Sequence, residues 1–217
     1  MKNNNLITEN LTSNSRIDEI DVSKNIGLIK SIVKNLTNKL KNNKDITSLS
    51  SLHINKNVRL FLYKVDKQIK VIINPIIIDK KDTKLSRETQ VGVKGEYIIP
   101  RFNEITLGYQ TEKGETKVET FIGGSSCIIQ QNTDLLDGVL LNDIGLELIE
   151  GWDEATDKEK QQVLDRYIVG LEHLEEVING EKETNSKLKL LSDNIENLTK
   201  QFINNYNKNK SFIDTTD

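Results

Sequence analysis

The residues that could do nucleophilic or metal chemistry in this chain are few and far apart. The sequence of 217 residues holds one cysteine, Cys127, and two histidines, His53 and His173. A single cysteine cannot form a disulfide within the chain or build a cysteine-rich zinc site. The two histidines are too distant in the sequence to share one turn of a helix. A lone thiol is most often a small buried apolar group, and one imidazole without a thiolate or carboxylate partner makes a weak site.

One segment has the spacing of apolar and polar residues that is typical of a metal-binding helix, but it lacks the thiolate and imidazole donors that would hold a metal. Residues 128–143 read IIQQNTDLLDGVLLND, in which apolar residues flank a polar run that ends at Gly138. Zinc and iron sites need thiolate, imidazole or carboxylate donors at close, fixed distances. The segment offers carboxamides and leucines where such donors would be expected.

The composition limits the class of protein. Hydrophobic residues make up 35% of the chain and charged residues 29%, with a formal net charge of −3. We expect one modest core with solvated helix or tail, and no general binding to nucleic acid. The N-terminus lacks the apolar run of a signal peptide, and no apolar stretch is long enough to span a membrane. We therefore expect a protein that is cytoplasmic at synthesis.

Hydrophobic spacing predicts helices at both ends and short antiparallel strands between them. The order of helix, strands, helix and helical appendages predicts an α+β fold. A hairpin turn is expected at 112–115, and Asn74-Pro75 is expected to end a strand. The expected helices are 23–42, 125–136, 155–179 and 185–204, and the expected strands are 58–65, 69–73, 76–78, 95–99, 104–110 and 116–122.

Several short motifs, in order and at matching intervals, resemble those of the peptide deformylases. The likeness covers roughly residues 24–170. It is carried by Ser48–His53, Arg59, Val71–Pro75, Glu88–Gly92, Ile99–Arg101 and Gln130–Gly138. The resemblance implies a deformylase-like fold, with antiparallel sheets packed around a central helix.

The same alignment of motifs departs from the family at the positions of its chemistry. In the family, a cysteine thiolate and two helix histidines hold a ferrous or zinc ion, and a glutamate beside the first histidine moves the proton. This chain has Gln90, Gln131 and Leu135 at the ligand positions, Asn132 at the glutamate and His53 at the glutamine that supports the oxyanion. A neutral carboxamide is a poor ligand, leucine is none, and asparagine does not titrate near neutral pH. We expect no catalytic, cofactor-binding or metal-binding residue, no cofactor and no enzymatic activity.

The residues that match the family are those that pack and pair. Glu88 is expected to have a structural pairing role, with Arg101 as its candidate partner, and Asp134 to orient the scaffold. Two alternatives stay open: an altered hydrolase that uses the peptide groove with His53 and Cys127 or Asp134, and an inactive module that binds peptides there.

The expected domain organisation is a flexible arm at 1–23, a deformylase-like domain at 24–180 and a helical extension at 181–217. Residues 1–44 carry eight Lys/Arg against four Asp/Glu, and residues 150–182 carry four against ten. The arm and the extension are the expected contact surfaces for protein partners or for self-association. Heavy use of Asn, Lys and Ile suggests an AT-rich gene, which fits a phage virion, tail or assembly component.

Overall fold

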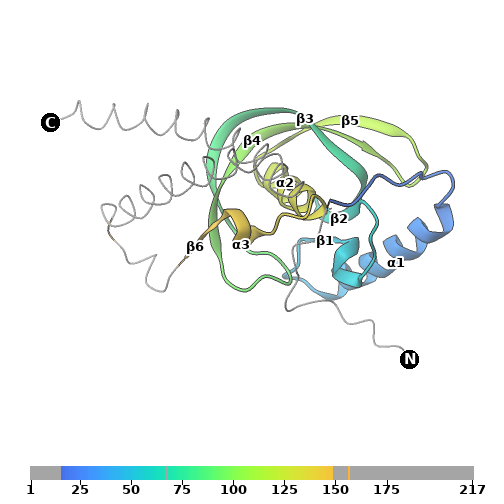
Figure 1. The fold of residues 1–217 in the computed structure, drawn as a ribbon, viewed down its shortest axis with the longest axis horizontal. Coiled ribbons are helices and arrows are strands. Elements are labelled where there is room, and N and C mark those ends of the chain that lie inside the picture. Colours follow the sequence, from blue (N-terminus) through green and yellow to red (C-terminus); the bar gives the residue numbers. More distant parts are fainter. Residues whose placement is uncertain (1–15, 67, 149–155, 157–217) are drawn as a thin grey trace, which may run out of the picture. The chain divides into compact units, whose positions relative to one another are not determined.

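The computed structural model describes residues 16–66, 68–148 and 156 (Figure 1). Its helices and strands, in chain order, are α1 (Ile26–Asn42), β1 (Ser48–Ser50), the 3-10 helix η1 (Ser51–Ile54), β2 (Leu60–Val65), β3 (Gln68–Glu88), β4 (Tyr97–Gln110), β5 (Thr116–Ile122), α2 (Gly124–Leu136), α3 (Leu141–Ile144) and β6 (Leu146–Glu147). The prediction of an α+β fold is confirmed. The helices expected at 155–179 and 185–204, and the whole extension at 181–217, lie outside the described residues.

The amphipathic helix expected near the N-terminus is present as α1. Its buried residues recur at intervals of three and four, as a helix with one apolar face requires. They are Ile29, Ile32, Val33, Leu36 and Leu40. This face joins a core of side chains from β1 and β2, among them Leu49, Leu60 and Leu62. Helix α1 is therefore held by tertiary packing of its apolar face.

The strands form an antiparallel sheet in the order β1-β2-β3-β4-β5, and β6 pairs with β4. A tight turn joins β2 to β3, so that Val65 lies opposite Gln68. The hairpin expected at 112–115 joins β4 to β5, with Gln110 opposite Thr116. Helix α2 packs against β1, β2 and β5 and has Ile129 and Leu136 fully buried.

Strand β3 is longer than the sequence predicted. The break expected at Asn74-Pro75 is absent because Asn74 adopts a positive φ of 51°, which asparagine tolerates, and the strand continues beyond it. The charged stretch 79–88, which lay outside the expected strands, belongs to the same strand. Its side chains are compatible with a strand because only Glu88 among them is buried and Lys81 pairs with Glu104 of β4 at 2.9 Å.

The boundary expected for the flexible N-terminal arm, 1–23, needs correction for its described part. Ile17 and Val22 are buried, and the backbone N–H of Ile17 donates to the Leu136 carbonyl at 2.9 Å. Asn74 both accepts from the Ile20 N–H and donates to the Ile20 carbonyl, at 3.0 and 2.8 Å. The packed domain therefore includes residues 16–22, and residues 1–15 are outside the described part.

The chain divides into two compact units. The first comprises residues 1–82, 89–94 and 102–141, and the second comprises residues 83–88, 95–101 and 142–217. Both long strands, β3 and β4, contribute residues to each unit. In the part of the chain that the structure describes, no helix has the length and apolar character to cross a membrane.

Candidate functional site

The five positions at which the chain departs from the deformylase motifs meet in one small pocket. Gln131, Asn132 and Leu135 come from α2, Gln90 from the segment after β3, and His53 from η1. Together with Ser48, Thr89, Val91 and residues 45–47 they line a cavity of about 70 Å³. All of these residues belong to the first unit. The structure thus brings together the positions that the motifs had selected, although they lie far apart in the sequence.

Gln90 is occupied by a backbone contact. Its side chain is buried, and its Oε1 accepts a hydrogen bond from the backbone N–H of Leu141 at 2.9 Å. Leu141 is also buried, so without Gln90 its N–H would have neither a protein partner nor water to bond to. The carboxamide therefore has a structural task in which its oxygen is already engaged.

The two remaining ligand positions also carry no donor suited to a metal. The amide nitrogen of Gln131 donates to the Thr89 carbonyl at 3.1 Å. Leu135 is an aliphatic side chain with 2% exposure and fills space in the wall of the pocket. One amide and one hydrocarbon stand where imidazoles would be needed.

Asn132, at the position of the proton-transferring glutamate, is bound as a hydrogen-bond donor. Its Nδ2 donates to Ser48 Oγ at 2.9 Å and to the Ile128 carbonyl one turn earlier at 2.8 Å. A carboxylate has no N–H to make either contact. The neutral amide links α2 to β1, and it cannot accept and release a proton near neutral pH.

His53 is held in one neutral tautomer. The backbone N–H of Ser50 donates to Nδ1 at 3.0 Å, so Nδ1 carries no proton, and Nε2–H donates to the Val91 carbonyl at 3.1 Å. Burial lowers the pKa of the imidazole below its ordinary value of 6.5, while the nearby backbone carbonyls of Val91 and Ser50 act in the opposite direction. Both ring nitrogens are engaged, so His53 ties η1 to the segment after β3.

Cys127 and Asp134 are not in the wall of this pocket. Cys127 is a buried free thiol in the first turn of α2, and Asp134 is half-buried on the same helix. Neither residue is brought to the pocket that contains His53.

The residues present do not fit the metal of the deformylase family. Within residues 16–66, 68–148 and 156, no group of three or more His, Cys, Asp or Glu side chains could hold an ion. The donor set of two engaged carboxamides and a leucine provides neither a thiolate nor an imidazole. No step through a metal ion is derived for this chain.

The scaffold around the pocket is held by two buried polar residues of the matching motifs, Gln130 and Arg59, whose partners the sequence did not predict. Gln130 hydrogen-bonds to both backbone groups of Phe102, since its Oε1 accepts from the N–H at 3.0 Å and its Nε2 donates to the carbonyl at 2.8 Å. Arg59 is 2% exposed, and its Nη1 donates to Asp137 Oδ1 at 2.6 Å and to the carbonyls of Ile17 and Leu136 at 3.3 Å. Arg59 and Asp137 are far apart in the sequence, so no periodic pattern of residues predicts that they pair.

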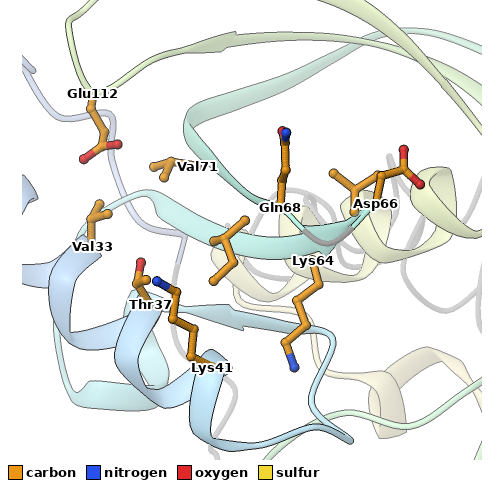
Figure 2. Close-up of a pocket in the computed structure, with 10 residues that line it drawn as sticks. Val33, Thr37, Lys41, Lys64, Asp66, Gln68, Val71 and Glu112 are labelled. Atoms are coloured by element: carbon orange, nitrogen blue, oxygen red, sulfur yellow. The ribbon is translucent and has the colours of Figure 1, made fainter.

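A second, larger depression lies beside α1 and the β2–β3 hairpin (Figure 2). It has a volume of about 740 Å³ and an apolar floor that includes Val33 and Val71, with Lys41 and Glu112 among the polar residues of its wall. Lys64 is also in the wall, but its ammonium already donates to the Asn43 carbonyl at 2.6 Å. Charges of both signs and the open form distinguish this depression from the small pocket under α2.

Comparison with known proteins identifies the family. The family model described as Polypeptide deformylase matches residues 9–145. A peptide deformylase of Pseudothermotoga lettingae is 32% identical over 107 residues, which are 46% of this chain and 59% of that protein. The chain thus matches less than two thirds of the length of this relative.

Solved structures of the family have the same fold. The peptide deformylase of Thermotoga maritima has a TM-score of 0.52 and 21% identity, over 64% of this chain and 89% of that one. A class I type b peptide deformylase of Acinetobacter baumannii has a TM-score of 0.58 and 17% identity, over 64% and 98%. That of Plasmodium falciparum has a TM-score of 0.55 and 20% identity, over 80% and 94%. In motifs, fold and matched length, the chain belongs to the polypeptide deformylase family.

Proposed function

We propose that this chain is a catalytically inactive member of the deformylase family that acts as a structural or interaction protein. The observation that carries the proposal is the set of contacts in the small pocket. By their motifs, Gln90 and Asn132 stand at the positions of a ligand and of the proton carrier. Gln90 is engaged in a buried hydrogen bond with Leu141, and Asn132 in a partly buried one with Ser48. We interpret both residues as replacements that stabilise the fold.

The chemistry of the family requires parts that this pocket lacks. A metal-bound water becomes a nucleophile near neutral pH because the ion lowers its pKa, and a carboxylate then takes the proton. Leu135 and the engaged carboxamides hold no ion, and Asn132 takes no proton. His53 does not substitute for either part, because both of its nitrogens contact backbone groups.

The size of the pocket supports an interaction role outside the old site. Pockets that enclose small ligands have volumes of about 300–1,000 Å³. The cavity under α2 has about 70 Å³, which is well below that range and leaves room for a few water molecules. This favours loss of both catalysis and peptide binding over an altered hydrolase or a peptide-binding module.

The nature of the partners is the finer part of the proposal. We propose protein partners, including components of a phage particle or of its assembly, that bind the basic N-terminal arm and the C-terminal extension. Support comes from sequence alone: the opposite charge balances of residues 1–44 and 150–182 and the near-heptad apolar positions of 185–204. Deleting residues 181–217 should abolish co-purification with the natural partner and leave the thermal unfolding of the domain intact.

Metal content tests the loss of the catalytic site. The full chain is purified anaerobically in ferrous and zinc buffers, and bound metal is counted by elemental analysis. A catalytically active deformylase carried through the same procedure calibrates retention. The proposal expects far less than one ion per chain. One tightly held equivalent of iron or zinc would contradict it.

A further inference from the structure

Strand β5 presents a row of backbone groups that no described strand pairs. It lies at the end of the sheet order, next to β4 alone (Figure 1). Two hydrogen bonds at the ends of the β4–β5 pair show which residues of β5 bond to β4. Thr111 N–H donates to the Glu115 carbonyl at 2.9 Å, and Gly123 N–H donates to the Asn103 carbonyl at 2.8 Å. Because hydrogen-bonded pairs alternate in an antiparallel ladder, the odd-numbered residues of β5 bond to β4. The N–H and C=O groups of residues 116, 118, 120 and 122 therefore point away from the sheet.

The same residues carry an apolar surface. Val118 and Ile122 are each 60% exposed, the largest exposures among the hydrophobic residues described. Val118 lies opposite Gly108 of β4, and a methyl group at position 108 would come within 3.1 Å of Ile78 Cδ1. Ile78 is itself 58% exposed. The outer face next to the free edge is thus an apolar row across three strands, continuous with the unpaired backbone of β5.

The sequence of β5 is complementary to itself in one antiparallel register. If Val118 lies opposite Val118 of a second copy, Lys117 lies opposite Glu119 of that copy and Glu119 lies opposite its Lys117. Residue 118 bonds outward, so the two-fold axis falls on a hydrogen-bonded pair, and Thr116 and Thr120 form two more such pairs. About six backbone hydrogen bonds result. The Lys–Glu pairs fall on the closer, non-hydrogen-bonded positions, where opposite charges stabilise and like charges destabilise. Within its own copy, Glu119 also accepts hydrogen bonds from Lys70 and Tyr109.

We infer that β5 is an interface at which two copies of this chain pair edge to edge, with Val118 on the two-fold axis. Moving the two-fold axis by one residue, from Val118 to Glu119, would place Glu119 against Glu119 and remove the charge complementarity. Isologous pairing of one strand with its own copy also closes the free edge on both molecules, which stops further addition. The inference does not depend on the loss of catalysis, since β5 contributes no residue to the pocket under α2.

The mass of the full chain in solution tests this interface. Sedimentation equilibrium is run from about 1 μM to about 1 mM, a range suited to an interface below the standard size. The mass should rise with concentration from 24.7 kDa toward twice that value. Val118→Lys places two ammonium groups on the axis and should keep the chain monomeric. Leu28→Lys is the matched control, because Leu28 is 42% exposed on α1, and it should dimerise like the wild type.

Disulfide capture tests the register. Residues on a hydrogen-bonded antiparallel pair have Cα atoms about 5.5 Å apart, within the range that a disulfide spans. Val118→Cys should therefore give a covalent dimer under mild oxidation. Ile122→Cys, equally exposed on the same strand, would face Gly114 of the second copy and should not. A chain that stays monomeric throughout, a dimer unchanged by Val118→Lys, or capture of Ile122→Cys in place of Val118→Cys would each overturn the inference.

Discussion

Glu88 and Arg101 form a buried two-point ion pair. Arg101 Nε donates to Glu88 Oε1 and Nη2 donates to Oε2, both at 2.9 Å, and the two residues are 8% and 1% exposed. The planar guanidinium matches the carboxylate and keeps both charges satisfied away from water. The prediction that Glu88 has a structural role and pairs with Arg101 is confirmed. Glu88, which belongs to one of the matching motifs, is thus part of the scaffold.

Replacing Glu88 with alanine should destabilise the chain by about 3–5 kcal/mol, because it leaves the Arg101 charge buried without a partner. Arg87→Ala is the control. Arg87 pairs with Glu96 at 2.7 Å, but the two side chains are 45% and 37% exposed, so its loss should cost at most about 1 kcal/mol. Urea unfolding measures both. Equal losses of unfolding free energy in the two variants would show that the buried pair stabilises the chain no more than the exposed pair.

Gln90 should matter for stability and not for metal binding. Gln90→Met keeps the approximate volume but removes the acceptor for the buried N–H of Leu141. An unsatisfied buried N–H costs about 1–3 kcal/mol. Gln131→Met removes a contact in a more exposed place and should change stability by about 0.5 kcal/mol or less. If Gln90→Met were as stable as the wild type, the structural role assigned to this carboxamide would be wrong.

His53 should make folding sensitive to mild acid. Burial lowers the pKa of its imidazole in the folded chain, whereas the unfolded chain binds the proton at the ordinary value of 6.5. The unfolded state therefore holds more protons below that pH, and stability falls as the pH drops from 6.5 toward the folded-state pKa. His53→Gln can still accept from Ser50 and donate to Val91 but does not titrate. The stability lost between about pH 7.5 and about pH 5.5 should be smaller in this variant, by urea unfolding.

Periodic and motif-bearing parts of the chain could be predicted, and for physical reasons. Helix α1 has apolar residues at intervals of three and four, and α2 carries the motif that meets β1 and η1 at the pocket. Spacing relative to a known family predicted that Gln90, Gln131 and His53 would lie together, because members of a family share the packing of the scaffold.

The unpredicted parts depend on single long-range polar contacts. Residues 16–22 have too few apolar side chains to show a period, yet Asn74 binds both backbone groups of Ile20. The charged half of β3 lay outside the expected strands, and its Lys81 forms an ion pair with Glu104 of β4. Such contacts join residues far apart in the sequence, so no local sequence pattern predicts them.

Release of formate from a formyl-methionyl peptide tests the central claim most directly. The full chain is loaded anaerobically with ferrous iron, assayed against a metal-free blank, and compared with the single variants Asn132→Glu and Gln131→His. We predict background rates for all three, because each variant restores one part where metal activation and proton transfer must act together. Only the combined Gln90→Cys, Gln131→His, Asn132→Glu and Leu135→His variant restores every donor. Formate release by the unmodified chain above the blank, abolished by a chelator, would contradict the account.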